Sequence, residues 1–262
     1  NKENKKMEKI FANLKEKSPW LLNYYKKYNK NRWILNPEQK ITKDCLINHL
    51  KENWPQLLIL EKTDIKNELR QFKNSSLMSI IARDINNLSD LDENLQSITN
   101  LAEICIQIAY EHSFGKESEK FYQNNKKTKK PDDLLIIAMG KLGGKELNPS
   151  SDIDLIFLNN DDSDKFEKLH NQNFYKNFIY NFIDILSSKT EEGMVYRVDT
   201  RLRPFGISGT LCPSILSLKN YFSTNAMNWE RFAWTKARVI NCAVFSPETN
   251  FKQNTTLFES IK

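Results

Sequence analysis

Two aspartates lie two residues apart within an apolar stretch of the chain. Asp152 and Asp154 open the run 152–158, which is short, rich in Ile, Leu and Phe, and bounded by turn-forming residues. These features predict a β-strand. Because side chains alternate across a strand, both carboxylates would lie on one face. Neighbouring carboxylates repel each other unless a cation lies between them, so the pair indicates a site for Mg²⁺. The alternative is a strand end whose solvent face is acidic.

A glycine-rich loop precedes this strand. The apolar run Leu134–Met139 predicts another strand, and three of the seven glycines of the chain follow at short spacing: Gly140, Gly143 and Gly144. Glycine lets backbone amides approach an anion closely. Ser150 and Ser151 add hydroxyl groups directly before the carboxylates. The combination predicts phosphate binding, although glycine pairs also mark ordinary connections between strands.

A third carboxylate lies in the stretch Met194–Arg203, where polar and apolar residues alternate. This alternation predicts a half-buried strand that ends at Pro204. Its polar face would carry four charged side chains: Arg197, Asp199, Arg201 and Arg203. A carboxylate among guanidinium groups suits a site that holds phosphates as well as metal. The alternative is a ladder of ion pairs on the surface of a sheet.

These stretches together resemble a known superfamily. They read AMGKLGGKELNPSSDIDLIFL, VYRVDTRLRPFGISGT and, further on, WERFAWTKARVI. The pattern is similar to that of nucleotidyltransferases of the DNA polymerase β type. It is most similar to the bacterial bifunctional glutamine synthetase adenylyltransferase/adenylyl-removing enzymes. The segments Leu69–Lys73 and Ile80–Ile85 also resemble the helical part that precedes the catalytic core of that family.

The resemblance implies an α+β fold, with a small mixed sheet and helices, preceded by a helical subdomain. It implies that Asp152, Asp154 and Asp199 are catalytic and hold two Mg²⁺ ions. The residues expected to bind nucleotide or phosphate are Gly143, Gly144, Ser150, Ser151, Arg201 and Arg203. The implied partners are glutamine synthetase as protein substrate, ATP or ADP, phosphate, and a PII-type signal protein acting through the full-length enzyme.

Family members carry two related domains, and three details favour the amino-terminal one. Arg197 stands before Val-Asp, Phe205 follows Arg-Leu-Arg-Pro, and Glu230-Arg231 follows Trp229. The domain so favoured removes AMP from a tyrosine of glutamine synthetase by phosphorolysis and releases ADP. The alternatives are the sister activity, which attaches AMP from ATP, and a catalytically silent regulatory fragment. A third, transfer to a small molecule, does not require the Trp-Glu-Arg segment.

The expected domain organisation has four parts. Residues 1–115 form a helical subdomain, 116–130 a polar linker, 131–245 the catalytic domain, and 246–262 a truncated or divergent tail. Within the catalytic domain, apolar residues from Phe166 to Leu186 predict a helix between the acidic strands. The start at Asn1 rather than at a methionine predicts a fragment of a longer chain.

A final helix is expected from about Ser214 to Asn241. One stripe of this helix would be core: Trp229, Phe232, Ala233, Ala237 and Ile240. A second face, formed by Arg231, Trp234 and Arg238, would meet either nucleotide or water.

The charge and the cysteine content of the chain bear on its ligands and on its cellular compartment. The formal charge of +6 comes from lysines spread along the chain, and no nucleic-acid recognition motif accompanies it. The four cysteines show no Cys-x-x-Cys pair, so neither zinc nor a disulfide framework is expected, and a reducing cytoplasm is the expected compartment. Neither a signal peptide nor a membrane-spanning segment is expected, because no apolar run in this sequence is long enough to span a membrane. The three histidines lie outside the motifs and are assigned no catalytic role: His49, His112 and His170.

Overall fold

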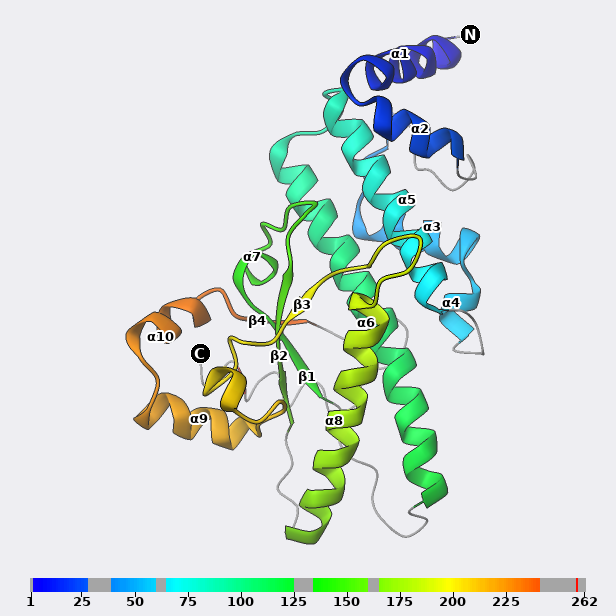
Figure 1. Ribbon diagram of the computed structural model, residues 1–262. Helices are drawn as coiled ribbons and strands as arrows, with labels where there is room; N and C mark the ends of the chain where they lie inside the picture. Colours follow the sequence, from blue (N-terminus) through cyan, green and yellow to red (C-terminus); the bar gives the residue numbers. More distant parts are fainter. Residues whose placement is uncertain are drawn as a thin grey trace.

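The computed structural model describes residues 2–27, 39–59, 65–124, 134–159, 165–240 and Phe258. Its amino-terminal part is helical, as Figure 1 shows. The helices are α1 (Lys2–Lys17), α2 (Pro19–Lys27), α3 (Lys43–Asn53), α4 (Gln56–Ile59), α5 (Ile65–Ile85) and α6 (Leu91–Asn124). The elements that follow are β1 (Leu135–Ala138), α7 (Gly140–Gly143), β2 (Ile153–Leu158), α8 (Lys165–Ser187), β3 (Val198–Asp199), α9 (Ile215–Thr224), α10 (Asn228–Trp234) and β4 (Arg238–Ile240). The α+β fold is thus confirmed.

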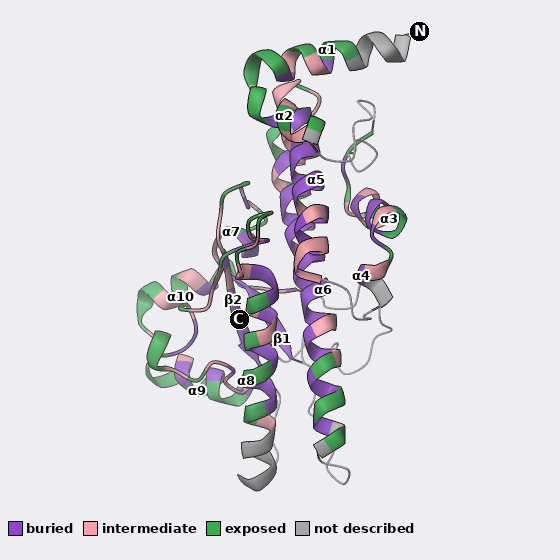
Figure 2. Cartoon of the chain, turned by 45° about the vertical axis from the view of Figure 1, so that its right-hand side comes forward, coloured by how far each residue is buried: buried purple, intermediate pink, exposed green. Residues whose placement is uncertain are grey.

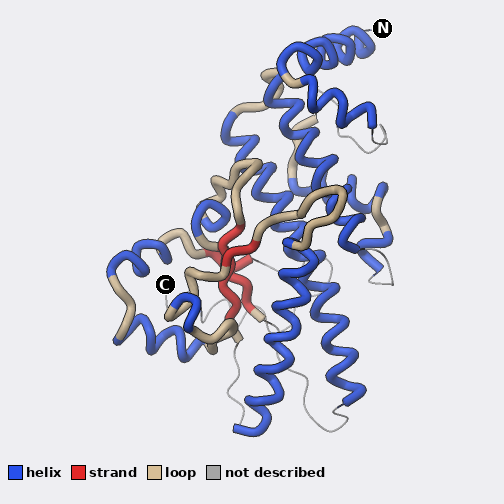
Figure 3. The backbone as a smooth tube through the Cα atoms, viewed as in Figure 1, coloured by secondary structure: helices blue, strands red, loops and turns tan. Residues whose placement is uncertain are grey.

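The four strands form one small mixed sheet in the order β3-β2-β1-β4, at the centre of the molecule (Figure 3). Strand β1 pairs antiparallel with both β2 and β4, whereas β2 pairs parallel with β3. Strands β1 and β2 are buried along almost their whole length, because both faces of the sheet are covered. This explains why their sequences are nearly continuous apolar runs.

Alternate residues of β2 contribute to two different hydrophobic clusters. Ile153 and Leu155 face the cluster that contains the long helices α5, α6 and α8. Ile156 and Leu158 face a smaller cluster formed with α9 and Trp234. Helix α6 packs against both α5 and α8, and buried residues of all three helices join residues of β1 and β2 in one cluster (Figure 2). By the same alternation, Asp154 lies on the α9 face of the sheet.

The division into a helical subdomain, a linker and a catalytic domain stays a prediction, but the boundary expected at residue 116 does not appear in the structure. Helix α6 continues to Asn124, so residues 116–124 of the expected linker are helical. Phe121, on this extension, packs edge-to-face on Phe174 of α8. The main core also runs without interruption from Ile41 in the helical part to Ile240 on β4. The polar composition around Lys116 therefore marks the exposed side of a helix rather than a linker.

The prediction of a single final helix over 214–241 is also wrong. The chain forms α9, a break at Asn225–Met227, α10, and then β4, which pairs with β1. Ile240 and Ala237 are buried as expected, but Trp229 and Phe232 are 62% and 76% exposed. The five residues cannot form one helical stripe, because α10 ends at Trp234 and the chain is extended from Arg238, where it pairs with β1. No described helix is both long and apolar enough to cross a lipid bilayer. The expected tail lies outside the described residues, apart from Phe258, which is buried beside Trp234.

Candidate active site

Two of the three predicted aspartates meet across neighbouring strands. Asp154 is the second residue of β2 and Asp199 the last of β3, and the two are direct partners in the parallel pairing. Paired positions on adjacent strands carry their side chains on the same face, with backbones about 5 Å apart. Asp152 opens the predicted strand but lies one residue before β2 as the structure has it. All three carboxylates therefore lie near the start of β2, where β2 pairs with β3.

The electrostatics of the two paired carboxylates differ. Burial raises the pKa of Asp154, and the negative charges of Asp199 and Asp152 raise it further. In contrast, the hydrogen bond from the Arg201 guanidinium lowers the pKa of Asp199 below its ordinary value. Asp154 is thus the carboxylate with the least compensated charge, and a bound cation would stabilise its ionised form.

Two exposed arginines accompany the carboxylates. The Arg197 guanidinium donates to Asp152 Oδ2. Arg201 donates from Nε to Asp199 Oδ2 at 2.8 Å, and its backbone N–H donates to Oδ1 at 2.8 Å. Both arginine side chains are 71% exposed. Because solvent reaches them, either guanidinium can exchange its aspartate for an anionic ligand.

Arg203 has a different environment from the one the alternating pattern predicts. Only Val198 and Asp199 are strand, and the chain then turns, with Phe205 in the left-handed region at φ 61°. The turn buries Arg203, whose guanidinium donates to three backbone carbonyls, those of Thr200, Ile207 and Gly209. Burial also lowers its pKa. The expectation of one strand through Arg203 is wrong, because these carbonyls hold the polar side chain inside a turn.

The glycines before β2 have steric roles in the structure. Gly140 adopts φ +54°, and a Cβ atom there would lie 2.6 Å from Asp154 Oδ2. A Cβ on Gly143 would lie 2.2 Å from the Lys236 carbonyl oxygen. The N–H groups of Gly143 and Gly144 donate to the carbonyls of Met139 and Gly140. These two amides are therefore occupied within the α7 turn, and their binding of phosphate stays a prediction.

Two serines and a lysine lie close to the carboxylates. Ser150 is exposed, and Ser151 Oγ donates to Asn148 Oδ1 at 2.7 Å. Lys141 Nζ lies 3.4 Å from Ser151 Oγ, and its charge lowers the pKa of Asp154 against the larger effects that raise it. Sequence reasoning did not assign Lys141 to the site. The signal was available, since a lysine between glycines before an acidic strand supplies a cation.

The donor set fits a hard divalent cation in part. In the described ranges, no three His, Cys, Asp or Glu side chains are already arranged as a metal site. The reason is visible in the contacts: Asp152 is turned to Arg197 and Asp199 to Arg201. Asp154 and Asp199 are direct partners in the parallel pairing, so their side chains share one face, and carboxylate oxygen is the donor that Mg²⁺ prefers. The residues therefore suit a magnesium ion that competes with the arginines for the carboxylates.

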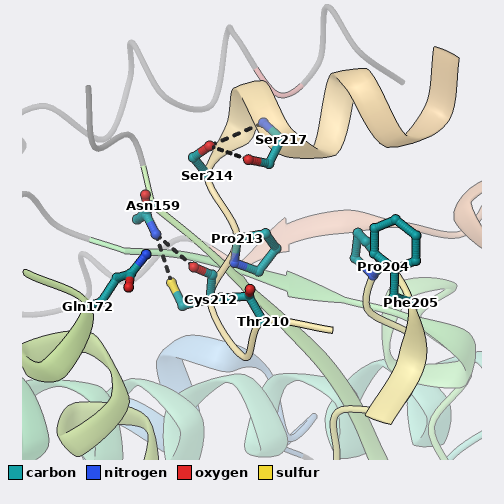
Figure 4. Close-up of a pocket in the computed structure, with 9 residues that line it drawn as sticks. All are labelled: Asn159, Gln172, Pro204, Phe205, Thr210, Cys212, Pro213, Ser214 and Ser217. Atoms are coloured by element: carbon teal, nitrogen blue, oxygen red, sulfur yellow. Dashed lines mark hydrogen bonds between the residues drawn. The ribbon is translucent and has the colours of Figure 1, made fainter. Parts of the chain in front are cut away.

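A separate pocket of about 230 Å³ opens near the other end of β2 (Figure 4). Asn159, Cys212 and Phe205 line it, and Asn159 Nδ2 donates to the Cys212 carbonyl at 2.8 Å. None of the residues lining it is charged, and none of the three aspartates is among them. It is therefore distinct from the acidic site.

The second face expected on the final helix does not form. Trp234 is buried, while Arg231 donates to the Phe222 carbonyl. Arg238 lies on β4 and pairs with Glu103 of α6 at 2.7 Å. His49 and His112 lie on α3 and α6, and the side chain of His170 is outside the described residues.

Comparison with known proteins identifies the family of this chain. The family described as glutamate-ammonia ligase adenylyltransferase matches residues 9–254. This chain belongs to that family. A bifunctional glutamine synthetase adenylyltransferase/adenylyl-removing enzyme of Nitrosomonas eutropha is 37% identical over 204 residues, which are 76% of this chain and 22% of the relative. The enzymes of the same name from Neisseria meningitidis serogroup A and Aromatoleum aromaticum are 38% and 39% identical, over 72% and 69% of this chain and 21% and 20% of theirs. The chain thus spans about a fifth of the length of the relatives it matches.

Proposed function

We propose that this chain removes AMP from an adenylylated tyrosine of glutamine synthetase by phosphorolysis and releases ADP. The observation that carries the proposal is the direct pairing of Asp154 with Asp199, beside two exposed arginines. Paired carboxylates suit metal-assisted displacement at phosphorus, and exposed guanidiniums suit an anionic nucleophile. The names of the relatives support this class of reaction.

Asp152, Asp154 and Asp199 would hold Mg²⁺, with two ions as the proposed number. When bound, the metal would neutralise charge on the adenylyl phosphate and stabilise the entering and leaving oxygens. Arg201, whose guanidinium donates to Asp199, would hold oxygens of the inorganic phosphate. Arg203 would support the turn that carries Arg201. The proposed lining of the remaining phosphates is Gly143, Gly144, Ser150 and Ser151.

The chemical balance of the reaction is simple. An oxygen of inorganic phosphate forms a bond to the phosphorus of the tyrosyl-AMP ester. The bond between that phosphorus and the tyrosine oxygen breaks, which yields ADP and a tyrosine phenolate that takes up a proton. Phenols have a pKa of about 10, so this leaving group needs little help from a general acid. The nucleophile is already an anion, so the site needs Lys141 and the arginines more than it needs a strong base.

The direction of the reaction rests on Arg197. The resemblance places a glutamate at this position in the adenylylating domain, whereas Arg197 here contacts Asp152. A cation at this point favours a phosphate nucleophile, and a carboxylate would favour deprotonation of a tyrosine. Glu230 does not help to distinguish removal of AMP from its attachment, because its carboxylate accepts hydrogen bonds from Tyr221 Oη and from the Met227 N–H at the start of α10. ATP and a PII-type signal protein belong to the proposed full-length context.

The test is ADP formation from adenylylated glutamine synthetase, with phosphate and Mg²⁺, beside an Asp152→Asn control. ADP that depends on phosphate and is lost in the variant supports removal. AMP transfer from ATP to the unmodified synthetase, without ADP from the modified one, would assign the sister activity. A folded sample that does neither would be a regulatory module.

A further inference from the structure

Strand β3, which carries Asp199, lies at the edge of the described sheet and is only two residues long. On its inner side it is held to β2, since Ile153 N–H donates to the Arg197 carbonyl at 3.0 Å. Its outer side presents the Tyr196 carbonyl and the Val198 N–H, which no neighbouring described strand pairs with. Backbone groups of this kind need other partners when they are shielded from water.

A single hydroxyl group satisfies both. Ser187, the last residue of α8, donates from Oγ to the Tyr196 carbonyl at 3.0 Å and accepts from the Val198 N–H at 3.1 Å. Its side chain therefore takes the place of a partner strand along this edge. The preceding carbonyl, that of Leu186, accepts from the N–H groups of both Val195 and Tyr196 at 3.0 Å. The end of α8 thus makes four hydrogen bonds to the backbone of Val195, Tyr196 and Val198, directly before Asp199.

The connection between α8 and β3 is anchored as well. Arg70 of α5 is fully buried and donates to the carbonyls of Ser188 and Gly193. Asn74, one turn further on, donates to the Glu192 carbonyl at 3.1 Å. With this loop held at both ends, the bonds of Ser187 set the final position of β3 relative to β2.

From these contacts we infer that Ser187 is a positioning residue, which sets the distance between Asp199 and Asp154 through the outer edge of β3. The inference rests on the proposed function insofar as the two carboxylates hold a metal. Removal of the hydroxyl would free the edge of β3 and widen the range of separations between the carboxylates. Loss of a group that orients a metal ligand typically changes affinity or activity about 10- to 100-fold, and Ser187 would act in this way through the backbone next to Asp199.

The experiment compares Ser187→Ala, Ser187→Thr and Ser187→Cys with Ser97→Ala. Ser97 is a matched control because its buried hydroxyl makes one long-range bond, to the Ile41 carbonyl at 2.7 Å. Three quantities are measured: ADP formation against Mg²⁺ concentration, Mn²⁺ binding by electron paramagnetic resonance, and hydrogen exchange of the Val198 amide. The inference predicts that Ser187→Ala weakens Mn²⁺ binding and raises the Mg²⁺ requirement about tenfold or more. It also predicts faster Val198 exchange, recovery in Ser187→Thr, and no change in Ser97→Ala.

Normal metal binding by Ser187→Ala with faster Val198 exchange would overturn the inference, as would unchanged Val198 exchange. Should Ser187→Ala fail to fold, Ser187→Cys keeps the shape with a weaker donor, and its full metal affinity would equally overturn it. Mn²⁺ binding and amide exchange do not depend on ADP formation. A wild-type chain that makes no ADP therefore contradicts the proposed function alone, and the role of Ser187 is still decided.

Discussion

Asp154 has the least balanced charge among the side chains of the proposed site. Its pKa is raised first by burial and then by Asp199 and Asp152, while the opposing charges of Arg201 and Lys141 are smaller in effect. A carboxylate held in this way costs stability in the absence of a cation and gains most when one binds. The site thus combines a stability cost with a binding function at a single residue.

Asp154→Asn is expected to stabilise the metal-free chain at neutral pH and to reduce activity at least about 100-fold. The folded-state pKa is raised, so the stability linked to the protonated carboxyl is fully present below about pH 4 and is lost as pH rises through the folded pKa. The gain in the variant should therefore appear above that window, as a rise in Tm of about 2 °C. Thermal unfolding in EDTA at pH 4 and pH 7.5 measures it, with the exposed Asp44→Asn as control. An equal Tm for variant and wild type at pH 7.5 would contradict the electrostatic assignment.

Substitution of Arg201 is expected to reduce activity and substitution of Arg203 to reduce stability, although the alternating sequence pattern places both side chains on one face. Arg201→Ala should lower kcat/KM for phosphate about 100-fold with little change in Tm, because its side chain is exposed. Arg203→Ala should lower the free energy of unfolding by about 2 kcal/mol, since three carbonyls lose their donor. Phosphate kinetics and urea unfolding of both variants check this. A strong loss of stability in Arg201→Ala would reverse the two roles.

At the level of elements, the parts that positioned the acidic pair were the most predictable. Strands β1 and β2 and helix α8 follow from apolar runs and helical spacing, which burial on the sheet enforces. Asp152, Asp154 and Asp199 could be selected because carboxylates in apolar strands need a chemical reason. The segment after Asp199 could not be predicted from alternation, because the carbonyls that hold Arg203 belong to Ile207 and Gly209, further along the chain. Helix α10 and strand β4 could not be predicted either, because the pairing of β4 with β1 is a contact between distant parts of the sequence.

The short helix α7 gives a prediction that distinguishes two adjacent glycines. Gly143→Ala should lower the free energy of unfolding by about 3 kcal/mol, because its Cβ would lie 2.2 Å from the Lys236 carbonyl oxygen and 2.6 Å from that of Ala138. Both are backbone atoms, and Ala138 is the last residue of β1 while Lys236 lies two residues before β4. Gly144→Ala is the matched control, with a change within about 0.5 kcal/mol. Its nearest contact would be the flexible end of Glu146, at 3.2 Å. Equal denaturant midpoints for the two variants would show that α7 does not pack on this carbonyl.

On the scale of the whole molecule, the helical part and the catalytic part share one core. Helices α6 and α8 pack through a series of aromatic contacts that includes Tyr110, Phe114 and Phe178. The Arg238–Glu103 ion pair then ties β4 to α6. The family resemblance implied a helical subdomain before the catalytic one, but the sequence does not reveal that both contribute to the same core.

This shared core predicts one cooperative unfolding transition for residues 41–240. Far-UV circular dichroism, which follows the helices, and near-UV dichroism, which follows aromatic packing, should give the same midpoint. Calorimetric and van't Hoff enthalpies should also agree. Two separated transitions would restore the division into independently folding subdomains.

The central claim is that phosphate attacks an adenylyl group at the paired carboxylates. The most direct measurement supplies radiolabelled inorganic phosphate with adenylylated glutamine synthetase and Mg²⁺, and follows the label into nucleotide. Labelled ADP that forms with the wild-type chain and is absent with Asp154→Asn is the predicted result. Release of AMP without incorporation of label, or labelled ADP formed equally by the variant, would contradict the claim.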